Sequence, residues 1–319
     1  MMTSRLKYLK KVIKSTAVFL LSLTAIAALS FFLVARLPGD AALNSMLPMG
    51  VTDTAVIENL RQSLGLDLSL PLRFINWLKG VLQLDFGQSF YYARAVSSVL
   101  ADASSVTVKV CTLAAFMILI LALPLGFYCA LKPDGIIDKI LHILAVLCLS
   151  LPTFLIGLII LSIGGAKLKI IGTLPATAYA DLIIPALTLA LPLVTYYIRQ
   201  IRIAVLKEID KPYICALIVR GIKLNRILVK HILPRALIAL LPLAAISLAR
   251  LLCGSVIVET VFSLNGLGAV ALKAVTMRDI NLIEAYIIYC AVIFILLNKS
   301  VDIICRRLSR YDEKGEDDV

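Results

Sequence analysis

Few side chains in this sequence could bind a metal ion or act as a nucleophile, and they are scattered. The chain has two histidines, His142 and His231, and no Cys-x-x-Cys or His-Glu-x-x-His pattern, so a catalytic metal site is not expected. Its seven cysteines lie mostly inside apolar stretches, without the spacing of metal ligands or of a disulfide framework. They are interpreted as small buried hydrophobic residues. We predict neither a cofactor nor an enzymatic activity for this chain.

Nucleotide binding by a phosphate-binding loop is also excluded. The Gly-x-x-x-x-Gly-Lys-Ser/Thr pattern is absent, and no Gly-Lys dipeptide occurs anywhere in the chain. The backbone and lysine that would hold the phosphates are therefore missing. Any ATP that this protein uses must be hydrolysed by another polypeptide.

Arg250 is the charged residue that most needs an explanation, because it lies within an apolar stretch at 235–258. An arginine in the middle of a membrane span costs about 2.5–3.5 kcal/mol unless it faces a cavity or a partner. It would either line a translocation pathway and meet an anionic group there, or form an interhelical ion pair. Asp181, Glu259 and Glu284 lie at the edges of apolar stretches, where we expect solvation or snorkelling.

The composition identifies the class of protein that must position these residues. Of the 319 residues, 61% are hydrophobic, and the mean hydropathy is +0.97, well above the level of soluble domains. The net charge is +12, but only 16% of residues are charged, and the basic ones cluster between apolar stretches. That pattern indicates cytoplasmic flanks of membrane helices rather than a nucleic-acid surface. We predict an all-α integral membrane protein in the lipid bilayer, with no nucleic-acid partner.

Six apolar stretches are long enough to cross the bilayer. The first follows five basic residues with no acid between them and is about 19 residues long, so it is interpreted as an uncleaved span rather than a signal peptide. The predicted spans are 17–35, 107–131, 140–163, 182–205, 235–258 and 282–305.

Alternate loops differ in basic charge. With the N-terminus inside the cell, the inner segments hold 21 Lys and Arg and the outer segments hold 9, so the bias favours cytoplasmic N- and C-termini. The predicted organisation is a first segment at 1–35, an extracytoplasmic cap at 36–105, a five-helix core at 106–305 and a charged, disordered tail at 306–319. Apolar residues at helical spacing predict two amphipathic helices in the cap, carried by Val56, Leu60 and Leu64 and by Phe74, Trp77, Leu78 and Val81.

The most informative polar stretch is the basic loop at 207–235, which this topology places in the cytoplasm. Nine residues separate Gly221 from His231, and Leu233 and Pro234 follow shortly after. A glycine here allows a short helix to end and the chain to reverse. Pro234 suits the first turn of the next helix, where its missing N–H costs nothing.

This loop resembles the EAA coupling loop of ABC importer permeases, whose pattern is Glu-Ala-Ala, three residues, Gly, nine residues, Ile, one residue, Leu-Pro. His231 occupies the Ile position, and Cys215 replaces the Glu, which is often absent from the peptide and nickel branch of the family. The residues that the resemblance assigns to coupling with an ATPase are Cys215, Ala216, Leu217, Gly221, Leu233 and Pro234.

Further ordered motifs extend the resemblance to the permease family for dipeptides, oligopeptides and nickel. Before the second span they are Arg-Leu-Pro-Gly-Asp at 36–40, Leu-Gly-Leu-Asp at 64–67 and Asp-Phe-Gly-Gln-Ser at 85–89. After it, the family blocks are Leu-Ser-Leu-Pro-Thr-Phe at 149–154, Glu-Thr-Val-Phe at 259–262, Gly-Leu-Gly at 266–268 and Arg-Asp at 278–279. Leu264 and Asn265 depart from the Trp-Pro that the family usually has.

Pro152, in the first of these later blocks, is expected to kink the third span, because proline removes one helical hydrogen bond. Together with Arg250 it is a candidate residue of the translocation pathway, although such a kink more often serves helix packing than gating.

The resemblance implies a transport subunit in the cytoplasmic (inner) membrane that pairs with a second homologous permease, two ATP-binding ABC subunits and an extracytoplasmic solute-binding protein. A coupling helix at about 216–225 would insert into a cleft of an ATPase subunit. Short peptides and chelated nickel rank nearly equal as substrates.

Two other classes of function are weaker. A secondary, ion-coupled transporter normally needs buried carboxylates near the middle of the membrane or inverted repeats. An intramembrane enzyme needs a nucleophile or a metal constellation, and none stands out.

Overall fold

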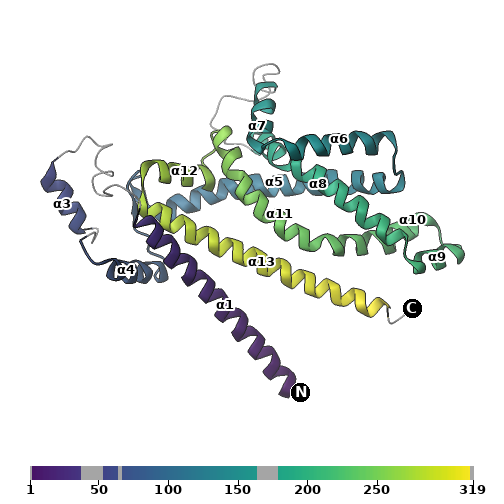
Figure 1. The fold of residues 1–319 in the computed structure, drawn as a ribbon, viewed down its shortest axis with the longest axis horizontal. Coiled ribbons are helices and arrows are strands. Elements are labelled where there is room, and N and C mark those ends of the chain that lie inside the picture. The colour runs from purple at the N-terminus through teal and green to yellow at the C-terminus, as the bar shows by residue number, and fades with distance from the viewer. Residues whose placement is uncertain (1, 37–52, 64–66, 164–178, 317–319) are drawn as a thin grey trace. The chain divides into compact units, whose positions relative to one another are not determined.

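The computed structural model describes residues 2–36, 53–63, 67–163 and 179–316, and helices form nearly all of their regular structure (Figure 1). Apart from Arg36 and Asp67, the motifs at 36–40 and 64–67 lie outside the described residues. In chain order the elements are α1 (Met2–Val34), α3 (Thr54–Ser63), α4 (Leu70–Leu82), β1 (Gln88–Ser89), β2 (Arg94–Ala95), α5 (Val96–Leu131), α6 (Ile136–Ser150), α7 (Thr153–Leu161), η3 (Tyr179–Leu182), α8 (Ile183–Ile209), α9 (Pro212–Val219), α10 (Leu224–Ile227), the π-helical turn η4 (Leu228–Ile232), α11 (Leu233–Val261), α12 (Leu267–Met277) and α13 (Ile280–Glu316).

Five helical segments of the described chain are long and apolar enough to cross a membrane, and a bent helix pair brings the number to six if it counts as one span. The single segments are Ala17–Val34, Val96–Leu131, Ile183–Ile209, Leu224–Ala244 and Ile280–Cys305. The described chain therefore has five to six candidate spans, where the sequence predicted six.

The bent pair corrects the prediction for the third span. The sequence analysis expected one helix with a kink at Pro152, but α6 ends at Ser150, and Leu151 and Pro152 have extended backbone. The helix α7 then leaves at an angle of 108° to α6. A residue that precedes proline avoids the helical region, and proline cannot donate to the preceding turn, so the two effects together end the helix.

The described chain divides into two compact units, Met1–Ser104 with Val270–Leu296 and Ser105–Ala269 with Leu297–Val319. In the second unit α8 is the central helix and packs against α6, α7 and α11 (Figure 1). Its inward-facing side chains are mostly small or β-branched. The hydroxyl of Tyr197 on α8 donates a hydrogen bond of 2.9 Å to the Ser247 hydroxyl on α11, which joins these two long helices.

In the first unit, α1 packs against α4 through aromatic side chains. Phe31 is 3% exposed, and its ring lies 5.3 Å from Phe74 and 5.5 Å from Trp77 between centroids. Phe74 and Trp77 are two of the residues whose spacing predicted a helix in the cap, and α3 and α4 confirm that both stretches are helical.

The β1–β2 hairpin of the first unit is hydrogen-bonded to Asp279, the residue before α13. Asp279 is 1% exposed, and its Oδ2 accepts a hydrogen bond of 2.6 Å from the Ser89 hydroxyl and one of 3.2 Å from the Tyr91 N–H. Its Oδ1 accepts a bond of 3.3 Å from the N–H of Leu282 in the first turn of α13. The 85–89 and 278–279 motifs therefore meet in one hydrogen-bonded cluster, and Asp279 also caps the helix.

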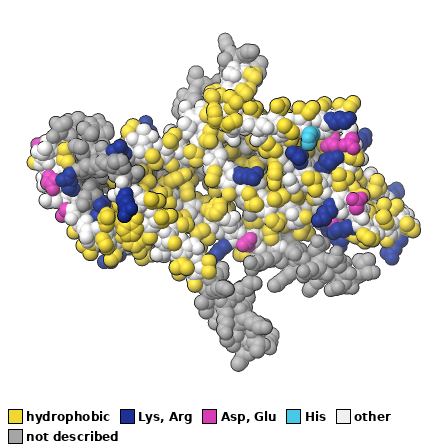
Figure 2. Space-filling model, in the orientation of Figure 1, with side chains coloured by type: hydrophobic (Ala, Val, Ile, Leu, Met, Phe, Trp, Pro, Cys, Tyr) yellow, Lys and Arg dark blue, Asp and Glu magenta, His cyan; other side chains and the backbone are white. Residues whose placement is uncertain are grey.

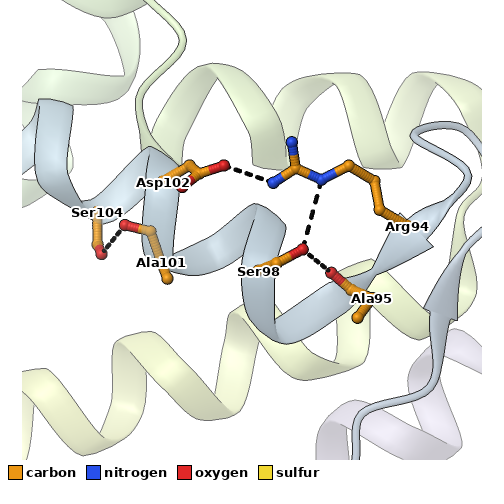
Figure 3. Close-up of polar contacts among 6 residues, drawn as sticks. All are labelled: Arg94, Ala95, Ser98, Ala101, Asp102 and Ser104. Atoms are coloured by element: carbon orange, nitrogen blue, oxygen red, sulfur yellow. Dashed lines mark hydrogen bonds and ion pairs between the residues drawn. The ribbon is translucent and has the colours of Figure 1, made fainter.

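The same hairpin also contacts the start of α5. Arg94 of β2 lies along the first turns of α5, where its guanidinium reaches Asp102 at 2.5 Å and the Ser98 hydroxyl at 3.4 Å (Figure 3). Both charged side chains are exposed, so this pair contributes little to stability. The buried Asp279 cluster is the stronger of the two attachments.

The C-terminal tail is a second correction. The sequence analysis expected residues 306–319 to be disordered, whereas α13 continues to Glu316. Residues 305–316 contain no proline, and their arginines precede their acidic residues, a composition that a helix continuing from a long span tolerates.

Candidate functional site

The basic loop between α8 and α11 forms two short helices at one end of those long helices (Figure 1). Cys215 and Ala216 lie exposed on α9, and Leu217 on the same helix is half-buried. Leu233 begins α11 and Pro234 lies in its first turn, as predicted from the missing N–H of proline. Three of the six predicted coupling residues thus lie on α9, Gly221 lies in the turn that follows it, and the other two begin α11.

Gly221 ends α9 in the way that its conformational freedom predicts. Its φ is +78°, in the left-handed region. Its N–H donates to the carbonyl of Ile218 at 2.9 Å, and the N–H of Ile222 donates to the carbonyl of Leu217 at 3.2 Å. This pair of bonds is the Schellman motif, which satisfies the last carbonyls of a helix.

The turn at Gly221 also corrects the expected coupling helix. The sequence analysis placed one helix at 216–225, but α9 ends at Val219 and α10 begins at Leu224. The coupling element is therefore a helix, a left-handed turn and a second, single-turn helix.

The tip of this element carries exposed apolar side chains that sequence reasoning missed. Val219 is 86% exposed, Leu224 is 55% exposed and Ile218 is 51% exposed. Other apolar residues of the same loop, Ile214 and Ile227, are fully buried. Some apolar side chains of the loop thus pack inside the protein, and others are exposed at the tip. The available sequence signal was the presence of large apolar residues on both sides of Gly221 in an otherwise basic stretch.

The base of the loop is held by Glu208, a buried carboxylate at the end of α8 with 6% exposure. Its Oε1 accepts a hydrogen bond of 2.7 Å from the Tyr213 hydroxyl, and Lys211 Nζ lies 2.8 Å from Oε2. Arg235 in the first turn of α11 lies 3.7 Å from Oε1 and stacks over the Tyr213 ring at 4.5 Å. Glu208 therefore joins α8, α9 and α11 at one point.

The surroundings of Tyr213 keep its hydroxyl protonated. Burial raises the pKa of Tyr213 to about 12, and the hydrogen bond and charge of Glu208 act in the same direction. A hydroxyl with this pKa is protonated throughout the physiological range, so it remains a hydrogen-bond donor to the carboxylate.

Arg250 lies on α11 and is exposed, with its guanidinium 5.4 Å from the ring of Tyr196 on α8. Within the described chain Arg250 makes no ion pair. Its contact between α11 and α8 is a cation–π interaction instead of the interhelical ion pair that was one of the two expectations. A mainly apolar cavity of about 410 Å³ lies between α5, α8 and α11, and its lining includes Leu251, the residue after Arg250. Pro152 lies at the start of α7.

Two further acidic residues differ from expectation, because Glu259 and Glu284 are buried rather than solvated. Glu259 Oε1 accepts a hydrogen bond of 2.6 Å from Thr107, and its Oε2 accepts from the N–H groups of Gly268 at 2.8 Å and Ala269 at 3.2 Å. The Thr107 hydroxyl in turn accepts from the N–H of Leu267 at 2.8 Å. Glu259 and Thr107 therefore cap the N-terminus of α12 together. The sequence did not reveal this cap because 152 positions separate the two residues.

Comparison with protein-family profiles identifies the family to which this chain belongs. Residues 122–311 match the profile of the binding-protein-dependent transport system inner membrane component, and residues 6–111 match the N-terminal profile of the same membrane component. The first match covers more than half of the chain and includes the whole coupling element. This chain is an ABC importer permease of the peptide and oligopeptide family.

Individual relatives agree with this assignment. The permease is 32% identical over 286 residues to the glutathione transport system permease protein GsiC of Pectobacterium atrosepticum, across 89% of this chain and 92% of that protein. It is 28% identical over 307 residues to a putative peptide transport system permease protein of Brucella abortus, across 93% and 95% of the two chains. Both relatives are matched along nearly their whole length.

The fold of the permease also resembles a solved structure. A chain of the MetNI methionine ABC transporter in an inward-facing conformation matches with a TM-score of 0.50 and 19% identity, covering 66% of this chain and 97% of that one. This likeness supports the helical fold of an ABC transporter. Family and fold together make the permease a multi-pass component of the inner membrane.

The permease has no described group of three or more His, Cys, Asp and Glu side chains that could hold a metal ion. His142 and His231, the two histidines, lie on α6 and in η4 respectively.

Proposed function

We propose that this permease is one membrane subunit of an ATP-driven importer that carries short peptides across the cytoplasmic membrane. In this arrangement it pairs with a second, homologous permease, two ATP-binding ABC subunits and an extracytoplasmic solute-binding protein. The observation that carries the proposal is the loop at 207–235, whose exposed apolar tip is mounted on a buried anchor. ATP hydrolysis takes place on the separate subunits.

The coupling element is suited to transmit force because its two ends are fixed. Glu208 ties its base to α8 and α11, and the Schellman motif at Gly221 sets the direction of the turn. Ile218, Val219 and Leu224 would enter a cleft on an ATPase subunit, where burial of their apolar surface favours binding. Closure of the ATPase subunits would then move the loop as a rigid lever and rock the helices between inward- and outward-facing states.

The proposed topology has six spans, with α6 and α7 forming one broken span, and both termini in the cytoplasm. The excess of Lys and Arg in alternate loops supports this orientation. Residues 36–105 would then form an extracytoplasmic cap, and Arg250 and Pro152 remain candidates for the translocation pathway.

Short peptides are the preferred substrate class because the relatives are named for glutathione and peptide transport. Chelated nickel, which the sequence motifs alone left equal, has no comparable support. The two are separated by deleting the gene and measuring uptake of a labelled dipeptide, labelled glutathione and radioactive nickel, with and without the restored gene. Loss of nickel uptake alone would contradict the peptide assignment.

The coupling role is tested at Gly221 with a matched pair of substitutions. No atom lies within 4 Å of the position that a Cβ would occupy there, so a substitution acts through the backbone rather than through crowding. Valine disfavours a positive φ strongly and asparagine tolerates it. We expect Gly221→Val to reach the membrane at normal levels and to lose at least tenfold in ATP-dependent uptake, while Gly221→Asn keeps most of it.

Uptake is measured in cells together with the amount of chain in the membrane. Equal transport by both variants would show that the left-handed turn is not needed for coupling. Substrate uptake that persists when the ATP-binding subunits are deleted would instead favour a secondary carrier.

A further inference from the structure

A second polar site lies in the same unit as the coupling loop, in a cavity of about 540 Å³ between α6 and α8. It shares no residue with the loop or with the Arg250 region. Basic side chains and apolar side chains line it together. The basic ones are Lys139, His142, Arg199 and Arg202, and the apolar ones are Leu141, Ile143, Ile198 and Ile203.

The charges in this cavity do not cancel. Arg202 is held by two acids, with Nε 3.1 Å from Asp138 Oδ2 and Nη2 3.8 Å from Asp134 Oδ1. Lys139 and Arg199 are exposed, and neither forms an ion pair with any residue in the described part of the chain. Two cations therefore face the cavity without an acidic partner.

The proposed topology places the cavity near the cytoplasmic boundary of the membrane. Its lining includes Asp134 in the turn before α6, and His142 is six residues into α6, about 9 Å from the start of that helix at 1.5 Å per residue. Ile143 is 60% exposed and Ile203 is 53% exposed beside them. Exposed isoleucines next to exposed cations are the pattern of a surface that meets acyl chains and head groups at once. Figure 2 shows such groups of Lys and Arg, with acidic side chains, set in a largely hydrophobic surface.

We propose that this cavity binds the phosphate head group of an anionic phospholipid. Lys139 and Arg199 donate to the phosphodiester oxygens, and the acyl chains lie along Ile143 and Ile203. Basic pockets between membrane helices are suited to such head groups because low-dielectric walls strengthen the attraction. The proposed topology places this lipid in the cytoplasmic leaflet, whereas the choice of an anionic lipid rests on the charges that line the cavity.

The acidic residues narrow the choice of anion. Asp134 and Asp138 offset part of the positive charge, which leaves a site suited to a singly charged phosphodiester rather than to a polyphosphate such as a nucleotide. The exposed isoleucines give a free phosphate ion nothing to contact. A lipid uses both parts of the cavity.

The test uses the full-length permease, purified in detergent, and titrates phosphatidylglycerol or phosphatidylcholine while bound lipid is counted by native mass spectrometry. We expect phosphatidylglycerol to bind and phosphatidylcholine to bind at least tenfold more weakly. The variant Lys139→Gln with Arg199→Gln should lose roughly 30-fold in affinity for phosphatidylglycerol, because each basic residue near an anionic lipid contributes about fivefold.

The matched control is Lys207→Gln with Arg226→Gln, which removes the same charge from exposed positions outside the cavity. It should bind phosphatidylglycerol within about twofold of the wild type. Equal losses in both double variants would mean a general charge effect and would overturn the proposal. Equal binding of the two lipids would do the same, and so would displacement of phosphatidylglycerol by millimolar inorganic phosphate, which would identify a soluble anion as the occupant.

Discussion

Two buried carboxylates anchor loops in this permease, and they do so with different partners. Asp279 holds the β1–β2 hairpin by accepting hydrogen bonds from neutral groups, the Ser89 hydroxyl and the N–H groups of Tyr91 and Leu282. Glu208 holds the coupling loop with one neutral hydroxyl, from Tyr213, and two cations, Lys211 and Arg235.

The difference separates an anchor made of neutral hydrogen bonds from one that also depends on charge. Backbone N–H donors cannot turn away from Asp279 without unfolding the turn that carries them. The cations around Glu208 are long side chains, and Lys211 is 40% exposed, so salt partly screens their attraction to the carboxylate. The anchor of the coupling loop is therefore expected to be sensitive to salt, whereas the anchor of the hairpin is not.

The largest effect is expected at Asp279. Asp279→Asn replaces one acceptor oxygen by an NH2 group that faces buried donors, which should destabilise the permease by about 2–3 kcal/mol. Thermal unfolding in detergent measures the loss. Asp85→Asn is the control, because Asp85 is exposed and an asparagine oxygen can still accept from the Gly87 N–H. The loss of stability in Asp279→Asn should not change with salt. Equal melting temperatures of Asp279→Asn and Asp85→Asn would show that Asp279 does not anchor the hairpin.

A smaller, salt-dependent effect is expected at Glu208. Glu208→Gln keeps an oxygen for the Tyr213 hydroxyl and loses only the attraction to Lys211 and Arg235, for about 1–2 kcal/mol. The difference from the wild type should shrink between 0.1 and 0.5 M salt, because the cations are partly exposed. Glu58→Gln, which removes the exposed pair with Arg61, should cost less than about 0.5 kcal/mol. A salt-independent loss as large as that of Asp279→Asn would refute the comparison.

The smallest effect is expected at Tyr213. Tyr213→Phe keeps the ring under Arg235 and removes one hydrogen bond, for about 1 kcal/mol. Because the folded pKa of Tyr213 is raised to about 12 from an ordinary value of 10.0, this contribution is complete below pH 10 and is lost as the pH rises through 12. The difference in melting between wild type and Tyr213→Phe should thus be constant from pH 6 to 9. A change within that range would show that Tyr213 ionises there.

Local patterns in the sequence predicted much of this structure. Apolar length located most of the spans, although the third is broken and the fifth candidate span is Leu224–Ala244 instead of the predicted 235–258. The chemistry of Gly221 and Pro234 correctly predicted the end of α9 and the start of α11. These features depend on neighbouring residues alone, so spacing is enough to find them.

Features that depend on distant residues were missed. Glu259 meets Thr107 across 152 positions and Asp279 meets Ser89 across 190, and no periodicity reports such pairs. Glu208, Lys211 and Tyr213 are close in sequence, but their common role requires knowing that Arg235 folds back beside them. The break at Pro152 was taken for a kink because sequence does not show whether neighbouring helices support a continuous axis.

The central claim is that the exposed α9 segment contacts an ATP-binding subunit, and native Cys215 on α9 reports on it directly. Inside-out membrane vesicles with and without the ATP-binding subunits are labelled with a membrane-impermeant maleimide, and Cys215→Ser gives the background. The account predicts that Cys215 is labelled in the permease alone and protected when the ATP-binding subunits are present. Labelling that is equal in both preparations would contradict the coupling role of this loop.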